Sequence, residues 1–177
     1  MKILGILRHA KSDWDDVGQR DFDRGLNDRG RKGAAVIGQH IRDHGARWDA
    51  VLASPAVRVK QTLEVSLPEM EPVWDERLYL ASVPTIFDVI RDHAGDADRV
   101  LISGHNPGLQ EILFELIPTE NENELFQQAI RKFPTASFAV LEIAIDDWAN
   151  LDGAKATLAH FARPRDLDPE LGPDTAR

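Results

Sequence analysis

The chain has 177 residues, of which 42% are hydrophobic and 29% are charged, a composition typical of one ordinary globular domain. Its formal net charge of −9 would repel a phosphate backbone, so nucleic acid is not an expected partner. The absence of cysteine excludes disulfides, thiolate metal sites and a cysteine nucleophile.

The sequence contains no stretch that approaches the roughly 20 apolar residues of a membrane span. It passes from Met1-Lys2 directly into a short apolar run, without the pattern of a cleavable signal peptide. We therefore expect a cytoplasmic protein with no membrane partner.

Three short apolar runs predict parallel strands that are buried on both faces of a sheet. A helical pattern follows each run. The first helix is predicted to begin after the cap Asn27 and to end near Gly45, and the second to span residues 55–67. The three runs are residues 3–7, 51–53 and 100–102.

Proline and glycine positions predict two more helices. One begins around Pro84 and ends before Gly95. The other follows the third apolar run, with Asn106 as its cap and Pro107 as its first residue, and ends near Pro118.

The last third of the chain has a different pattern. Residues 119–124 are polar and acidic without periodicity, which predicts an exposed loop. Residues 137–145 and 155–163 are strand-like and predict an antiparallel pair. We expect residues 1–163 to form a single domain and residues 164–177 to form an irregular tail.

Strands that alternate with helices predict an α/β fold. The expected architecture is a three-layer sandwich, in which a mostly parallel central sheet carries helices on both faces and ends in the antiparallel C-terminal strand pair. In such sheets, ligands bind beyond the carboxyl ends of the strands. The polar residues at those ends are therefore the first candidates for a functional site.

Arginine and histidine occupy the predicted strand ends. Arg8 and His9 end the first strand, Arg58 lies one turn into the helix after the second, and His105 follows the third. Two guanidiniums near helix N-termini form an anion site, for which phosphate is the natural ligand. Neighbouring arginines also lower the pKa of a histidine and keep it neutral, so His9 can act as a nucleophile toward phosphorus.

These residues also carry a resemblance to the histidine phosphatase superfamily, which has the phosphoglycerate mutase-like fold. Arg8-His9-Ala10 resembles its RHG motif, residues 54–62 resemble its second-arginine motif, and residues 104–107 resemble its second-histidine motif. Residues 8–12 and 24–30 are similar to the SixA-type phosphohistidine phosphatases.

The resemblance implies roles for the matched residues. It makes His9 the nucleophile and places Arg8, Arg58 and His105 around the phosphate. Arg24 matches an arginine that SixA-like members have near the site.

Three further residues complete the set of candidates. Asn106, inside the second-histidine motif, is expected to help bind phosphate. Many phosphomonoesterases of the superfamily use a carboxylic acid from the segment after the second-arginine helix, and Asp75 and Glu76 are the candidates here. No metal or other cofactor is expected.

We therefore expect a metal-independent phosphatase that dephosphorylates phosphohistidine on a partner protein. Between Leu80 and Val100 there is room for little more than one helix, so no capping domain can enclose a small metabolite. Two alternatives stay open: a phosphomonoesterase for small molecules, and a non-catalytic module that binds phosphate or a phosphoprotein.

The remaining histidines and acidic residues are expected to be structural. His40 and His44 share a helix face without an evident third metal ligand, and His93 and His160 have no partner in the sequence. An acidic segment is expected to be a solvated loop that borders the site. Its members are Asp13, Asp15, Asp16, Asp21 and Asp23.

Overall fold

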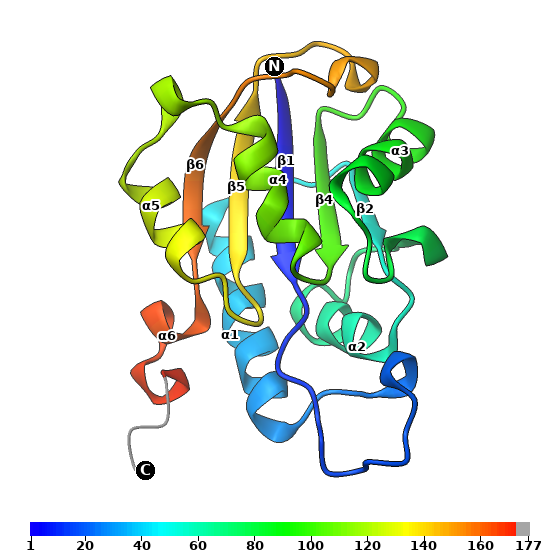
Figure 1. The fold of residues 1–177 in the computed structure, drawn as a ribbon. Helices are drawn as coiled ribbons and strands as arrows, with labels where there is room; N and C mark the ends of the chain where they lie inside the picture. Colours follow the sequence, from blue (N-terminus) through cyan, green and yellow to red (C-terminus); the bar gives the residue numbers. More distant parts are fainter. Residues whose placement is uncertain (173–177) are drawn as a thin grey trace.

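The computed structural model describes residues 1–172 and contains a six-stranded central sheet with helices on both faces (Figure 1). The strand order is β3-β2-β4-β1-β5-β6, in which β1 to β4 are parallel and the β5-β6 pair runs antiparallel. The predicted α/β sandwich is therefore confirmed. The strands are β1 (Lys2–Arg8), β2 (Ala50–Ala53), β3 (Val73–Trp74), β4 (Arg99–Gly104), β5 (Phe138–Ile143) and β6 (Ala156–Ala162).

Two helical layers cover the sheet. In Figure 1, α3 (Val83–His93), α4 (Gly108–Leu116) and α5 (Glu124–Arg131) lie in front of it. The helices α1 (Asp28–His44) and α2 (Val57–Ser66) lie behind it. Within residues 1–172, no helix combines the length and hydropathy required to cross a membrane.

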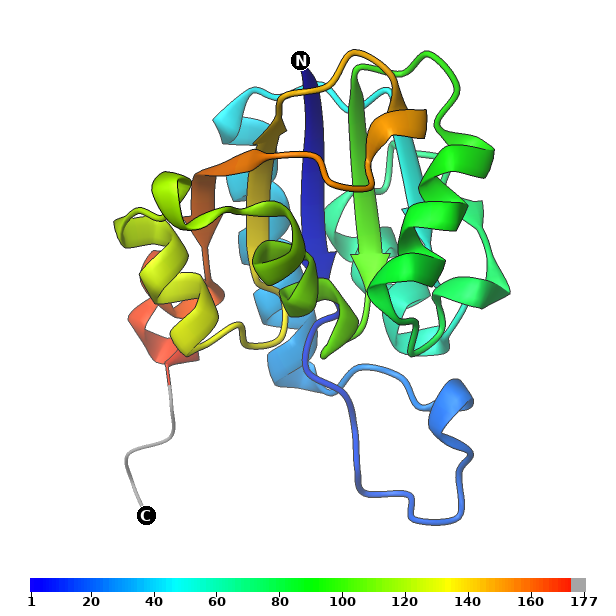
Figure 2. The same ribbon diagram turned by 45° about the horizontal axis from the view of Figure 1, so that its top comes forward.

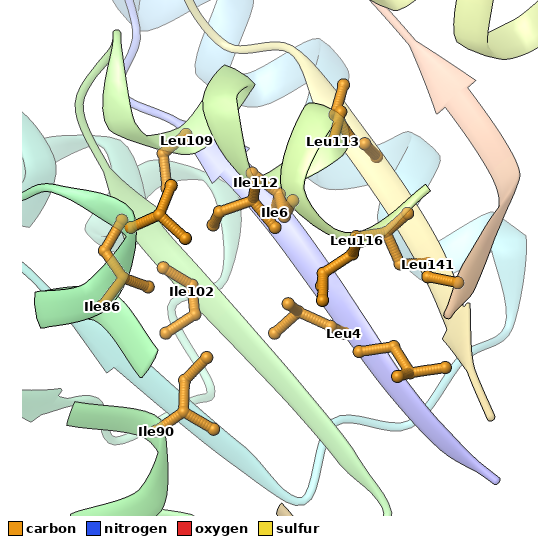
Figure 3. Packing of buried hydrophobic residues seen from close by; sticks show 14 of the residues in the cluster. Leu4, Ile6, Ile86, Ile90, Ile102, Leu109, Ile112, Leu113, Leu116 and Leu141 are labelled. Carbon is orange, nitrogen blue, oxygen red and sulfur yellow. The ribbon is translucent and has the colours of Figure 1, made fainter. Parts of the chain in front are cut away.

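The strands read as continuous apolar runs because both faces of the sheet are covered. Successive side chains alternate between the faces, so Leu4 and Ile6 of β1 pack under α3 and α4, whereas Leu7 packs toward α1 and α2. Figure 3 shows the first of these clusters, where Ile102 and Ile112 meet Ile6. Burying one such side chain contributes about 1.5–3 kcal/mol to stability.

The predicted ends of α1 are confirmed. The Asn27 side chain accepts a hydrogen bond from the backbone N–H of Gly30 at 2.7 Å, which satisfies one donor of the first turn. Gly45 has a left-handed backbone with φ of 81°, the conformation that glycine adopts most readily after a helix. Local sequence therefore determines both ends of this helix.

The start of α4 differs from the prediction by one residue. Pro107 is the cap and Gly108 the first helical residue, whereas we expected Asn106 and Pro107 in these positions. The Asn106 amide nitrogen donates to the backbone carbonyl of Phe133 at 3.1 Å, and its Oδ1 accepts from the backbone N–H of Gln110 at 3.3 Å, so the side chain still satisfies one donor of the first turn. A Cβ at Gly108 would overlap the carbonyl of Ala81, so a glycine permits the close approach of α4 to that segment.

The segment 119–124 is largely exposed, as expected, but it is more ordered than a plain loop. It contains the 3-10 turn Thr119–Asn121, and Asn123 caps α5 by accepting from the backbone N–H of Phe126 at 2.9 Å. The side chains of Asn121 and Asn123 both donate to β6 carbonyls at 3.0 Å. The helix α5, which has only eight residues, was not predicted.

Residues 164–172 also differ from the irregular tail that we expected. They form a short helix, α6 (Pro164–Leu167), and a 3-10 turn, Pro169–Leu171. The Asp166 carboxylate pairs with the Arg163 guanidinium at 2.8 Å and accepts from the Arg163 backbone N–H, which caps α6. Residues 173–177 of the expected tail lie outside the described residues.

A cluster of three histidines joins α1 to the edge of the sheet. His40 Nε2 lies 2.7 Å from His160 Nε2, and the ring centroids of His44 and His160 are 4.3 Å apart. His160 is therefore structural, as expected, and its partners lie on α1. Burial, followed by the charges of His44 and His40, lowers the pKa of His160 to about 4. Within residues 1–172, no group of three or more histidine or carboxylate side chains could hold a metal ion.

We predict that the stability of the fold decreases as the pH falls from about 6.5 toward about 4. The unfolded chain binds protons in this range, whereas the folded His160 ring stays neutral. His160→Gln removes this difference, so its melting temperature should fall less than that of the wild type between about pH 7.5 and about pH 5. Thermal unfolding followed by circular dichroism measures the effect, and an identical pH dependence in the two proteins would contradict it.

Candidate active site

The sheet brings the predicted strand ends together. Arg8 pairs with Gly104 in the parallel ladder of β1 and β4, so His9 and His105 leave the sheet side by side. The backbone N–H of His9 donates to the Gly104 carbonyl at 3.0 Å, which continues the ladder by one step. In Figure 1 these strand ends form the lower edge of the sheet, and the segment 9–27 extends below it (Figure 2).

His9 is buried, and of its ring nitrogens only Nδ1 forms a hydrogen bond among residues 1–172. Its Nδ1–H donates to the carbonyl of Ala10 at 2.7 Å, which fixes the tautomer and leaves the lone pair on Nε2. Burial is the largest cause that lowers the pKa of His9 to about 3. The Ala10 hydrogen bond opposes it, and the positive charges of Arg8, Arg58 and Arg24 add to the lowering of the pKa. The ring is therefore neutral near pH 7 and can act as a nucleophile.

His105 lies next to His9, with 5.3 Å between the ring centroids. Its Nε2–H donates to Ser54 Oγ at 2.8 Å, and its Nδ1 accepts from Arg58 Nη2 at 3.3 Å. Burial and the charge of Arg58 lower the pKa of His105 to about 3. Ser54 thus has a structural task that we had not assigned: it orients the second histidine.

Two arginines border the histidine pair. Arg58, which is 3% exposed, donates to the backbone carbonyl of Asp21 at 2.7 Å. Arg8 donates to the Phe133 carbonyl at 3.0 Å, and Asn106 donates to the same oxygen at 3.1 Å. The amide of Asn106, which we expected to bind phosphate, is therefore engaged in holding the segment that orients Arg8.

The third predicted arginine, Arg24, lies in the same cluster. It is 6% exposed, donates to Ser12 Oγ, and its guanidinium carbon lies 3.5 Å from the ring centroid of the exposed Trp14. The Nε atoms of Arg8, Arg24 and Arg58 are buried without an acceptor within residues 1–172. Guanidiniums that are short of acceptors favour the binding of an anion.

Sequence reasoning missed Asp21, which is the anion of this cluster. Its carboxylate accepts from Arg24 Nη2 at 2.7 Å, from Arg58 Nη2 at 3.0 Å and from the Tyr79 hydroxyl. Partial burial raises the pKa of Asp21, but the hydrogen bonds from Tyr79, Arg24 and Arg58 outweigh this effect and hold the pKa well below its usual range. The carboxylate occupies donors that a phosphate would need.

One signal could have identified Asp21 within the acidic segment that we expected to be solvated. It precedes Arg24 by three residues, and buried arginines require a negative partner to offset their desolvation. Asp23, in the same 3-10 turn (Asp21–Asp23), pairs only with the exposed Arg20, at 2.8 Å, among the described contacts. Only the tertiary structure shows that Asp21, and not Asp23, contacts the buried arginines.

The helix α2 supports the segment after His9. Thr62 Oγ1 accepts from the backbone N–H of Ala10 at 2.9 Å and donates to the Arg58 carbonyl at 2.7 Å. Gln61 accepts from the backbone N–H of Leu26 at 2.8 Å. The residues that resemble the second-arginine motif therefore provide both a guanidinium and the hydrogen bonds that hold the loop beside it.

The two candidate acids are placed differently from expectation. The Asp75 carboxylate binds Arg77 at 2.8 Å and His93 at 2.9 Å, so His93 has the structural role expected for it. These interactions, led by the hydrogen bond from Arg77, hold the pKa of Asp75 well below its usual range. Glu76 is exposed. Among the described contacts, neither carboxylate meets His9 or His105.

Comparison with known proteins agrees with this geometry. The sequence profile of the histidine phosphatase superfamily (branch 1) matches residues 4–79. The uncharacterized protein MT1313 of Mycobacterium tuberculosis is 34% identical over 160 residues, which cover 90% of this chain and 100% of that protein.

Two solved structures are similar over nearly their whole length, and both are described provisionally as the phosphohistidine phosphatase SixA. The protein from Nakamurella multipartitia is 29% identical with a TM-score of 0.81, over 92% of this chain and 96% of the other. The protein from Agrobacterium tumefaciens is 30% identical with a TM-score of 0.75, over 92% and 98%.

We predict that Asp21→Asn tightens the binding of inorganic phosphate or vanadate about fivefold, a change of about 1 kcal/mol. The neutral amide competes less strongly than the carboxylate for Arg24 and Arg58. Calorimetric titration measures the affinity, and Asp23→Asn is the matched control because Asp23 pairs with Arg20 instead. Weaker binding by Asp21→Asn would mean that the carboxylate is needed to hold the arginines in position.

Proposed function

The chain belongs to the histidine phosphatase superfamily, in its SixA-type group, and we propose that it hydrolyses phosphohistidine on a protein through an intermediate on His9. The observation that carries this proposal is the His9 imidazole, buried, neutral and free at Nε2 among three guanidiniums. A site that only captured phosphate would need the cations but no nucleophile.

The first step transfers the phosphoryl group between two imidazoles. His9 Nε2 attacks phosphorus while the bond from phosphorus to the substrate nitrogen breaks. A substrate ring that is protonated on its other nitrogen leaves as neutral imidazole, so the enzyme does not need to supply a proton. The His9 ring becomes positive, and the Ala10 carbonyl that accepts from Nδ1–H stabilises this charge.

The second step returns His9 to its starting state. Water attacks the phosphorus, the bond to Nε2 breaks, and dihydrogen phosphate leaves with both protons of the water. In both steps Arg8 and Arg58 offset the charge that spreads over the phosphoryl oxygens. For these contacts to form, the phosphate must displace the Asp21 carboxylate from Arg58.

The carboxylates near the pocket support phosphohistidine over an alkyl phosphate as the substrate. An alkoxide leaving group requires a general acid, and such an acid has a pKa raised toward neutrality. The hydrogen-bond partners of Asp21 and Asp75 hold their pKa values below the usual range, so both carboxylates stay ionised. Imidazole leaves without such an acid. A phosphohistidine substrate therefore suits a pocket whose nearby carboxylates are both ionised.

The shape of the fold supports a substrate group carried by a protein. Between Leu80 and β4 the chain forms α3 and short connections, without a further domain over the site. A mutase or an enzyme for a small metabolite encloses its intermediate. Without such a domain, a side chain on the surface of another protein can approach the strand ends past the segment 9–27.

We predict that the wild-type protein, quenched during turnover with a ³²P-labelled phosphodonor, retains an acid-labile label. His9→Ala should abolish the label, because the P–N bond can form only on this ring. His93→Ala, which removes a histidine outside the pocket, is the matched control and should keep it. An active wild-type protein without label would refute the covalent intermediate.

We also predict a substrate preference. The ratio kcat/KM for a phosphohistidine peptide should exceed that for sugar phosphates at least about tenfold. The reason is that the pocket lacks a general acid to protonate an alkoxide leaving group. Release of phosphate, measured over a panel of both substrate types, gives the comparison. Equal or faster turnover of sugar phosphates would make the protein a phosphomonoesterase for small molecules, and phosphate binding without any turnover would make it a binding module.

A further inference from the structure

A cavity of about 300 Å³ lies beside the segment that follows His9. Its walls come from the segment after His9, the turn before β5, the start of α1, and α6 with the residues that follow it. Figure 1 shows α6 beside the lower half of α1, which lies behind the sheet. The lining residues are Ala10, Lys11, Arg29, Gly30, Gly33, 132, 134–136, Pro164, Arg165, Leu171 and Gly172.

The cavity adjoins the backbone of the segment that carries His9. The backbone N–H of Ala136, a lining residue, donates to the His9 carbonyl at 2.9 Å. Lys11 follows His9 by two residues, and its carbonyl accepts from the backbone N–H of Asn27 at 3.1 Å. A Cβ at Gly30 would overlap that carbonyl, so glycine allows the segment to lie against α1. A ligand in the cavity therefore lies beside the segment that follows His9.

The charge of the lining is entirely positive. Lys11, Arg29, Lys132 and Arg165 line the cavity, and none of its lining residues is an aspartate or glutamate. Within residues 1–172, none of these four cations forms an ion pair with a carboxylate. Four like charges around one cavity repel one another, and in a chain with a net charge of −9 this arrangement favours an anionic ligand.

We propose that this cavity binds the acidic side chains that flank the phosphohistidine on the substrate protein. The inference rests on the proposed function and adds a recognition element to it. Because Lys11 is so close to His9 in the chain, the carboxylates must lie within a few residues of the reacting group. Lysine and arginine of the cavity then bind them as charge-assisted pairs, which orient the substrate and accelerate its association.

The test compares two phosphohistidine peptides. One has glutamate on both sides of the histidine, and the other has glutamine at the same positions. Wild-type kcat/KM should be about fivefold higher for the glutamate peptide, through a lower KM. In the variant Lys132→Gln/Arg165→Gln this advantage should fall below about twofold, while kcat/KM for the glutamine peptide stays within about twofold of wild type. High salt should reduce the advantage in the wild type.

The control variant Arg99→Gln/Lys155→Gln removes the same charge at the opposite end of the sheet, where Arg99 begins β4 and Lys155 precedes β6. It should keep the preference for the glutamate peptide. An equal loss in this control would reduce the effect to net charge and would overturn the inference. A wild-type protein that hydrolyses both peptides equally well would also overturn it and leave the proposed function intact.

Failure of the proposed function gives a different result. In that case the wild type hydrolyses neither peptide. The proposal that the cavity recognises a phosphohistidine substrate is then refuted together with the proposed function. Titration of the unphosphorylated glutamate peptide into the His9→Ala protein tests the cavity separately. Binding that Lys132→Gln/Arg165→Gln weakens at least about threefold would support the anionic ligand, and binding without this difference would refute it.

Discussion

Arg8 pairs with Gly104 where the parallel strands β1 and β4 end, and the other contacts of the site are arranged around this pair. It sets His9 against His105 and brings their rings to 5.3 Å. A slip of one residue in the register would turn each side chain of β1 to the opposite face. Since Leu4 and Ile6 are buried under one helical layer and Leu7 under the other, the core resists such a slip and thereby fixes the site.

Electrostatics sets the chemical state of the pocket that this register creates. Burial and three nearby guanidiniums keep His9 neutral, so in the proposed reaction the charge that attracts phosphate also maintains the nucleophile. The same cations would repel one another without a counter-charge, and Asp21 supplies it to both Arg24 and Arg58. One carboxylate therefore links the stability of the folded pocket to its affinity for phosphate.

The sequence allowed prediction of those features that depend on local patterns. The cap Asn27, the glycine at 45 and the apolar runs are short-range signals, and the four residues at strand ends followed once a parallel sheet was assumed. Asp21 was not predicted, because its contact with Arg58 joins residues 37 positions apart. The fold of residues 164–172 depends in the same way on packing, since Pro164 is buried against α1.

The bond between Asp21 and Arg58 also affects how an enzyme with this site completes its cycle. Free phosphate is both the last product and a ligand for the arginines, so a pocket that held it too strongly would be inhibited by its own product. An internal carboxylate that reclaims the guanidiniums opposes this inhibition at every turnover. In the proposed reaction, the carboxylate weakens the binding of the substrate phosphate and, for the same reason, speeds the release of the product phosphate.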